Sequence, residues 1–190
     1  MILIIDNYDS FTYNLMQYIG SINDKIKVIK NDELIFDEIK ELAISHIVIS
    51  PGPGNPKNTG ISLEIIKKLS PMIPTLGICL GHQAIAYHYK ANIVNAHNIL
   101  HGKTSIITHN GKSILYQDMP EEFLATRYHS LCVDKKFKNR NINITSWSDD
   151  GEIMSLEHTK YPIYGIQFHP ESILTEHGMQ IIKNFINIVV

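Results

Sequence analysis

The sequence predicts an α/β fold, with an open, mostly parallel twisted sheet, helices on both faces, and a smaller antiparallel strand region in the second half. Two observations support this prediction. Over residues 1–90, short apolar runs alternate with segments of helical length, which is typical of parallel strands joined by right-handed crossovers. Beyond residue 90, the apolar runs are separated by Asn, Gly and Asp, which favours antiparallel strands.

The first half of the chain supplies the parallel strands and the helices that connect them. Each expected strand is a short apolar run rich in isoleucine. The expected strands are Ile2–Ile5, Ile26–Ile29, Ile47–Ile49 and Ile73–Gly77, and the expected helices are Ser10–Ile19, Leu34–Leu42, Ile61–Leu69 and His82–Tyr89. Residues that follow such strands lie at the carboxyl edge of the sheet, where open α/β folds bind ligands.

The second half of the chain is expected to complete the same domain. Ser105–Thr108 and Ile142–Thr145 are predicted antiparallel strands, and the basic stretch Lys135–Asn141 is a predicted exposed loop. A final helix over Glu176–Ile188 closes the fold. With 190 residues, of which 44% are apolar, the chain is long enough to bury one substantial core, so we expect a single domain over residues 1–190.

Cys79 lies between Gly77 and Gly81, after an apolar strand and before a predicted helix. This spacing is the pattern of a nucleophile elbow, in which a Cβ at either flanking position would clash with its counterpart or with substrate. We therefore expect Cys79 to be presented rather than buried, with the helix N-terminus favouring its thiolate. The alternative is a small apolar cysteine that fills a strand end.

A nucleophilic cysteine needs a base, and His169 is the best candidate. It ends a short apolar strand that Pro170 cannot continue. Because residues two apart on an extended segment point the same way, Glu171 can accept a hydrogen bond from the imidazole and fix its tautomer. Together with Cys79, these residues predict a Cys-His-Glu triad in that chain order.

Three other residues compete for these roles. His82 and His129 lie close in sequence to the predicted site segments, and we expect structural roles for both. Ser130 is a conceivable nucleophile, but it lacks the glycine-framed turn that presents Cys79.

The segment Ser50–Pro56 follows a core strand and alternates proline with glycine. Proline fixes the backbone and glycine lets the main chain approach a ligand closely, so selected N–H groups can be aimed at an oxyanion. Gly52 N–H is the candidate for one donor. Leu80 N–H, which follows the nucleophile at the helix start, is the candidate for the second. The alternative is a tight loop with no such role.

Other motifs fail on spacing. Gly102-Lys103-Thr104 is similar to the end of a phosphate loop, but His97 stands where that loop needs glycine. Lys57 likewise replaces the third glycine of a dinucleotide fingerprint. His97, His101 and His109 lack the paired carboxylate or thiol pattern of a metal site, so we expect no metal.

These segments together resemble the class I glutamine amidotransferases, which carry a Cys-His-Glu triad on an open α/β fold. The resemblance extends over nearly the whole chain. Four further strings are similar to the small subunits of anthranilate synthase and aminodeoxychorismate synthase: Asp6–Thr12, His101–Thr104, Arg127–Leu131 and Pro170–Thr175. The chain departs from this family at Tyr89-Lys90-Ala91, where relatives commonly carry a Gly-Gly pair, so the helix end lacks its usual residue for positive φ.

The resemblance assigns roles to particular residues. It implies that Cys79 is the nucleophile, His169 the acid and base, and Glu171 the group that orients the imidazole. It also implies that Gly52 and Leu80 form the oxyanion hole. The residues implied to surround the glutamine substrate are Gly52, Pro53, Gly54, Gln83, Ser130 and Leu131.

The function implied is a glutaminase subunit that hydrolyses L-glutamine to glutamate and channels ammonia to a chorismate-binding synthase large subunit, in a heterodimer or heterotetramer. Anthranilate synthase component 2 is the favoured identity, and aminodeoxychorismate synthase component 2 or a shared subunit is the alternative. A stand-alone cysteine hydrolase or peptidase and a catalytically silent assembly subunit are alternatives from other classes. The resemblance implies no cofactor in this chain, and any Mg²⁺ requirement belongs to the partner.

Composition excludes several classes of partner and location. A net charge of −2, from 17 basic and 19 acidic residues, gives no electrostatic footprint for nucleic acid. Cys79 and Cys132 are too few for a disulfide framework, and a nucleophilic thiol must stay reduced. Residues 1–6 enter a strand directly, and no apolar run approaches the roughly 20 residues that cross a bilayer. We expect a cytoplasmic protein without membrane contact, or a plastid stromal one if the gene is organelle-encoded.

Overall fold

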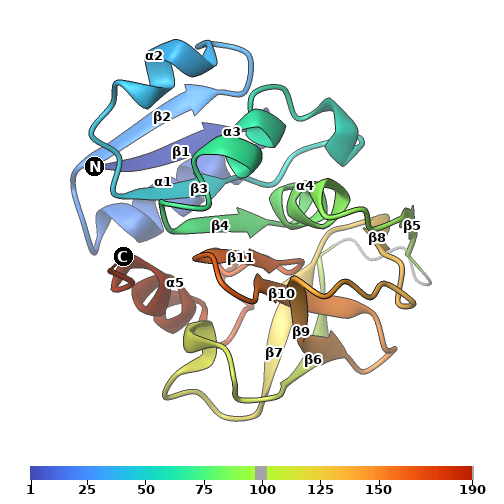
Figure 1. The fold of residues 1–190 in the computed structure, drawn as a ribbon. Helices are drawn as coiled ribbons and strands as arrows, with labels where there is room; N and C mark the ends of the chain where they lie inside the picture. Colours follow the sequence, from blue (N-terminus) through green and yellow to red (C-terminus); the bar gives the residue numbers. More distant parts are fainter. Residues whose placement is uncertain (97–101, 190) are drawn as a thin grey trace.

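A twisted, mixed β-sheet forms the centre of the computed structural model, which describes residues 1–96 and 102–189 (Figure 1). Its strands are β1 (Ile2–Asp6), β2 (Ile26–Lys30), β3 (His46–Ile49), β4 (Thr75–Ile78), β6 (Lys103–His109), β7 (Glu122–Arg127), β9 (Ile142–Ser148), β10 (Ile153–His158) and β11 (Ile163–Ile166). Within the described ranges the strand order is β2-β1-β3-β4-β11-β10-β9-β6-β7. A separate antiparallel pair joins β5 (Ile93–Asn95) to β8 (Leu131–Val133).

Helices cover both faces of the parallel part of this sheet, as predicted. The helices are α1 (Thr12–Gly20), α2 (Phe36–Lys40), α3 (Ser62–Lys68), α4 (Leu80–His88) and α5 (Gly178–Ile186), with short 3-10 turns at Pro56–Asn58 and Ile114–Tyr116. Residues of α1 and α5 pack in one core, and residues of α2, α3 and α4 pack in the other. Strand β1, which lies between β2 and β3, is apolar on both sides, and its alternate residues pack in different cores.

The predicted antiparallel region of the second half exists, and it extends the main sheet. Next to β11 the pairing becomes antiparallel: β10 pairs with β11, β9 with β10, β6 with β9, and β7 with β6. The apolar alternation of the second half predicted strands of this kind, whereas their attachment to the parallel sheet depends on long-range pairing that no local pattern contains.

The strand before His169 decides where the site forms. β11 lies beside β4 and runs parallel to it, with Gly165 opposite Gly77. The backbone N–H of Cys79 also donates to the Ile166 carbonyl at 2.8 Å. The chain therefore leaves β4 and β11 at the same edge of the sheet, although these strands are far apart in sequence.

The helix starts differ from the sequence prediction by one or two residues: α1, α2, α3 and α5 begin late, and α4 begins early. α1 begins two residues late because the Phe11 N–H and the Thr12 hydroxyl donate to the carboxylates of Asp9 and Asp6, both at 2.7 Å, which holds a turn there. α4 begins two residues early, at Leu80, because the backbone turns into the helix directly at Cys79. The free N–H groups of this helix consequently start right beside the sulfur.

At the end of α4, one residue adopts a left-handed conformation even though the glycine that usually supplies it is absent. Lys90 adopts φ of 71°, a left-handed conformation normally given to glycine. The N–H of Ala91 donates to the Ala86 carbonyl at 2.9 Å, and the N–H of Lys90 donates to the Tyr87 carbonyl at 2.9 Å. The helix is thus closed by the usual hydrogen bonds, at a conformational cost of about 1 kcal/mol for a residue with a side chain.

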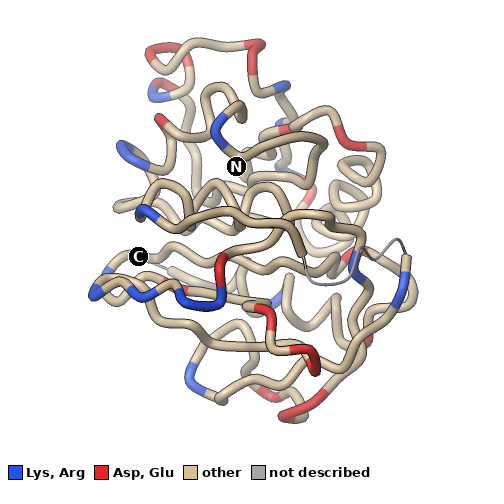
Figure 2. The backbone as a smooth tube through the Cα atoms, turned by 90° about the vertical axis from the view of Figure 1, so that its right-hand side faces the viewer, with Lys and Arg blue, Asp and Glu red and all other residues tan. Residues whose placement is uncertain are grey.

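Charges of both signs are interspersed along the described backbone in Figure 2. None of the helices in the described ranges combines the length and apolarity that a bilayer crossing requires.

Candidate active site

Cys79 occupies a strained elbow between β4 and α4. Its backbone has φ 51° and ψ −101°, a rare conformation for a residue with a side chain. A Cβ on Gly77 would lie 2.5 Å from the Gly81 carbonyl oxygen, and a Cβ on Gly81 would overlap the Ile49 carbonyl oxygen. The turn therefore requires glycine on both sides of the cysteine, as the sequence pattern predicted.

The expectation that Cys79 is presented rather than buried was wrong. The residue is only 8% exposed, because β11 and the loops that follow β3 and β7 surround the elbow. It lies on the walls of two cavities, a small one of about 150 Å³ and a larger one of about 430 Å³. The thiol is consequently reached through the cavities and not from the open surface.

The structure brings His169 and Glu171 into contact. Nδ1 of His169 lies 2.7 Å from Oε1 of Glu171, and both side chains are buried. A carboxylate only accepts, so Nδ1 carries the proton and Nε2 is the nitrogen left for chemistry. Nε2 is buried, with no partner at hydrogen-bond distance within the described residues, and it is the ring atom available to the nearby Cys79. Phe11 and Tyr128 hold the ring by edge contacts at centroid distances of 5.5 and 5.0 Å.

The environment of His169 favours its charged form. Burial lowers the pKa of the imidazole, but interactions with Cys79 and Glu171 outweigh burial and raise the pKa well above its ordinary value of 6.5. A protonated imidazole beside the sulfur is the partner that an ionised thiol needs. The site thus places a positively charged imidazole next to the Cys79 sulfur.

The two rival histidines are held neutral. Burial lowers the pKa of His82 to about 4. Burial, followed by the charge of Arg127, lowers the pKa of His129 to about 3. Arg127 Nε donates to His129 Nε2 at 3.0 Å, so the His129 proton is on Nδ1 and faces the Leu131 carbonyl at 3.0 Å. Both rings therefore act as fixed structural groups, and neither has the environment of an acid or base at neutral pH.

Acidification is expected to destabilise the protein through His82. The folded-state pKa of about 4 lies below the ordinary 6.5, so the unfolded chain binds the proton first as the pH falls. The free energy of unfolding should then decrease below pH 6.5, by about 2 kcal/mol from this group at about pH 5. Urea denaturation of the wild type and His82→Leu at about pH 7 and about pH 5 measures the effect. The pH-dependent loss should shrink by that amount in the variant, and an unchanged loss would contradict the assignment.

The loop after β3 is anchored close to the elbow. The backbone N–H of Asn7 donates to Ser50 Oγ, and the Asn7 side-chain amide donates to the Ser50 carbonyl, both at 2.9 Å. A Cβ on Gly52 would lie 2.5 Å from Asn7 Cβ and 2.9 Å from Leu80 Cδ2, so only glycine allows this packing. Within the described residues, the backbone N–H groups of Gly52 and Leu80 donate no hydrogen bond, and both residues line the small cavity beside Cys79.

All six residues predicted to surround substrate line that same small cavity. They are Gly52, Pro53, Gly54, Gln83, Ser130 and Leu131, joined by Cys79, Leu80, Tyr128 and His129. The structure thus gathers side chains from the loop after β3, helix α4 and the segment before β8. A volume of about 150 Å³ is suited to one small molecule rather than a length of peptide.

The segment that carries Ser130 rests on a buried guanidinium. Arg127 is fully buried and donates to Ser105, to both carboxylate oxygens of Asp150 at 3.1 and 3.2 Å, and to Glu152. Through His129 it also supports the Leu131 carbonyl. This network fixes the far wall of the cavity.

Sequence reasoning missed the roles of three residues. Asn7 and Arg127 belong to strings that carried the family resemblance, yet nothing local indicated that one anchors the Gly52 loop and the other the Ser130 segment. Gln167 was passed over entirely, although its side-chain Nε2 lies 3.5 Å from the Cys79 sulfur. Its position two residues before His169, directly after strand β11, was the signal that could have found it.

Of the three histidines considered as metal ligands, the structure describes only His109. His109 lies 2.8 Å from the Pro120 carbonyl and stacks on Tyr116, while His97 and His101 lie outside the described residues. In the described part, no group of three or more His, Cys, Asp or Glu could hold a metal ion.

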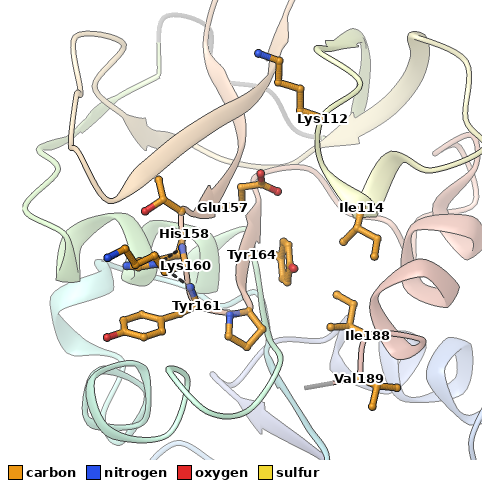
Figure 3. Close-up of a pocket in the computed structure, with 11 residues that line it drawn as sticks. Lys112, Ile114, Glu157, His158, Lys160, Tyr161, Tyr164, Ile188 and Val189 are labelled. Atoms are coloured by element: carbon orange, nitrogen blue, oxygen red, sulfur yellow. Dashed lines mark hydrogen bonds between the residues drawn. The ribbon is translucent and has the colours of Figure 1, made fainter.

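Another cavity, of about 430 Å³, lies at the opposite end of β11 from His169 (Figure 3). Its labelled side chains come from β10 (Glu157), the turn that follows it (Lys160), β11 (Tyr164), the segment around Ile114 and the chain beyond α5. None of the predicted site residues lines it.

The fold and the site together describe an α/β protein with a cysteine elbow and a carboxylate-paired histidine at the carboxyl edge of a parallel sheet. The sequence matches the family described as glutamine amidotransferase class-I over residues 3–189. The chain belongs to this family.

Several relatives are similar over nearly the whole chain. It is 53% identical to anthranilate synthase component 2 of Cyanophora paradoxa, covering 98% of each chain. It is 48% identical to the aminodeoxychorismate/anthranilate synthase component 2 of Bacillus subtilis, covering 98% of this chain and 95% of that one. It is 51% identical to the bifunctional protein TrpGD of Thermotoga maritima, covering 98% of this chain but only 32% of that protein.

A solved structure shares the fold. The crystal structure of a glutamine amidotransferase from Thermotoga maritima superposes with a TM-score of 0.76, covering 90% of this chain and 75% of the other. At 19% identity, this likeness concerns the fold alone.

Proposed function

We propose that this chain is the glutaminase subunit of a chorismate-using synthase, as component 2 of anthranilate synthase. The observation that carries the proposal is the position of Cys79 beside the buried His169–Glu171 pair and between two cavities. The relatives named above support the choice of synthase, because two of them bear the name of an anthranilate synthase component.

The first half of the reaction forms a thioester. The Cys79 thiolate attacks the side-chain amide carbon of glutamine, and the carbonyl oxygen becomes an oxyanion that the N–H groups of Gly52 and Leu80 can bind. The imidazolium of His169 transfers its Nε2 proton to the amide nitrogen, since an amide anion cannot leave unaided. The carbon–nitrogen bond breaks, ammonia departs, and the γ-glutamyl group remains on sulfur.

The second half regenerates the thiolate. His169 is now neutral and takes a proton from a water that attacks the thioester carbon. The carbon–sulfur bond breaks, glutamate is released, and the imidazolium and thiolate pair is restored. Glu171 holds the same ring nitrogen throughout, so the imidazole presents Nε2 in both halves.

The small cavity matches a free amino acid. Gln83 uses both N–H bonds of its side-chain amide within the protein, one to the Leu131 carbonyl at 2.8 Å and one to Gln167 Oε1 at 3.0 Å. Its carbonyl oxygen is then the atom that can meet a ligand, which suits the α-ammonium of glutamine. The Ser130 segment on the facing wall is placed to bind the rest of the α-amino acid group.

The larger cavity supplies the route by which ammonia would leave. It shares Cys79 with the small cavity and is lined by Tyr8–Phe11, Pro51–Pro53, Tyr128 and His169. Free ammonia at neutral pH is mostly protonated and no longer nucleophilic, so it is useful only when passed directly to an acceptor. A chorismate-binding large subunit seated over this opening would receive it.

Reconstitution tests the proposal. The purified chain is mixed with an anthranilate-forming large subunit or an aminodeoxychorismate-forming one, and glutamate release and aromatic product are measured with glutamine as nitrogen donor. We expect anthranilate formation and faster glutamate release with the first partner. Product with the aminodeoxychorismate subunit alone would transfer the proposal to that synthase. Partner-independent hydrolysis of peptides, or no glutamate release with either partner, would overturn it.

A further inference from the structure

Gln167 contacts the proposed nucleophile, and the mechanism above gives it no role. The residue follows β11, is fully buried, and directs its side-chain Nε2 to the Cys79 sulfur at 3.5 Å. Its backbone N–H donates to the Met154 carbonyl at 2.8 Å, which fixes where the side chain begins. A buried amide held against a reactive sulfur is placed to influence the charge on that sulfur.

The hydrogen bonds around Gln167 define which end of its amide faces the sulfur. The Leu131 backbone carbonyl can only accept, so the Gln83 atom 2.8 Å from it must be the amide nitrogen. The second N–H of that nitrogen meets Gln167 at 3.0 Å, so the Gln167 atom there must be the carbonyl oxygen. The remaining end of Gln167, toward Cys79, is therefore an N–H donor.

We propose that Gln167 is a further catalytic residue, whose side-chain N–H donates to the Cys79 sulfur and stabilises its thiolate. Gln83 keeps the Gln167 amide in this orientation and connects it to the substrate wall at Leu131. The inference deepens the proposed function and rests on it. Because the sulfur carries negative charge as attacking group and as leaving group, but not in the thioester, the bond is stronger at the two charged stages.

Alkylation of the free chain by iodoacetamide tests the proposal without a partner or substrate. The rate of modification of Cys79 is measured by mass spectrometry across the pH range in which thiols ionise, for the wild type, Gln167→Leu and Gln167→Glu. Loss of one charge-assisted donor should move the midpoint of the pH profile up by about one unit in Gln167→Leu, so that the rate at pH values below the wild-type midpoint falls about tenfold. Gln167→Glu should slow it further, because a carboxylate of the same size would face the thiolate.

Controls separate this role from a purely structural one. Gln180, which donates to Asn184 on α5, receives the same change, and Gln180→Leu should leave the alkylation profile unchanged. Thermal melting establishes that the variants are folded. If neither Gln167 variant folds, Gln83→Glu is compared instead, because it removes the donor that orients Gln167 and should also slow alkylation.

The outcomes distinguish this inference from the proposed function. An unaltered rate and pH midpoint in folded Gln167 variants, or in Gln83→Glu where that variant is used, would overturn the inference while leaving the glutaminase proposal intact. A slowed, shifted profile in a chain that releases no glutamate with either synthase partner would support the inference and reject the function.

Discussion

Replacing Cys79 by serine should abolish glutamine-dependent synthesis, by at least about a thousandfold, while synthesis from added ammonium continues. The serine hydroxyl is not ionised at neutral pH, so the His169–Glu171 pair has no ready nucleophile to serve. The partner's own chemistry needs only ammonia, which added ammonium supplies without any step at Cys79. The measurement compares product formation from glutamine and from ammonium in the reconstituted complex.

Cys132 provides the matched control for this change. It is the other cysteine of the chain, lies on β8, and is buried with its sulfur 3.9 Å from the Asn95 carbonyl. Burial raises the pKa of this thiol to about 12, so it is not ionised at neutral pH. Cys132→Ser should retain glutamine-dependent synthesis. Equal loss with both nitrogen sources in Cys79→Ser, or full activity with glutamine, would show that Cys79 is not the nucleophile.

Replacing Arg127 by methionine should lower the free energy of unfolding by about 3–5 kcal/mol. The guanidinium is fully buried and pairs with Asp150 and Glu152, so its removal leaves two carboxylates in the interior without their cation. The change also removes the donor that fixes His129, and the glutamine KM should rise because the Ser130 segment loses its support. Urea denaturation and steady-state kinetics measure the two effects.

Two comparisons make this prediction specific to the buried network. Arg140 is exposed, and Arg140→Met should change the free energy of unfolding by less than about 0.5 kcal/mol. Adding Glu152→Gln to Arg127→Met should recover part of the loss, because one unpaired charge is removed. Equal stability of Arg127→Met and Arg140→Met would contradict the assignment of the network.

Local sequence patterns predicted the parallel half of the fold well, because its signals are short-range. Isoleucine-rich runs such as Ile2–Ile5 predict strands by themselves. The glycines around Cys79 predict a tight turn, because the turn leaves no space for a Cβ at either position. The contact of His169 with Glu171 was also predicted from their spacing of two residues, although the chain turns at Pro170 and Glu171 instead of staying extended.

The rest depended on contacts between distant segments. That β11 lies beside β4, and that this neighbour buries Cys79, follows from strand pairing over almost ninety residues of chain, which the 88-residue separation of Gln167 from Cys79 illustrates. Arg127 is a single basic residue in a strand, and its burial is explained only by its ion pairs with Asp150 and Glu152. Composition and spacing alone do not predict such contacts between residues that are far apart in the sequence.

Trapping the covalent intermediate tests directly whether the Cys79 sulfur forms a bond to the γ-glutamyl group. The reconstituted complex is mixed with glutamine, quenched rapidly in acid, and digested for mass spectrometry. The peptide that contains Cys79 should gain the mass of one glutamyl group, through a linkage that hydroxylamine cleaves, and Cys79→Ser should lack it. Full glutamate release with this peptide unmodified at every quench time, or with the adduct on another residue, would contradict the mechanism.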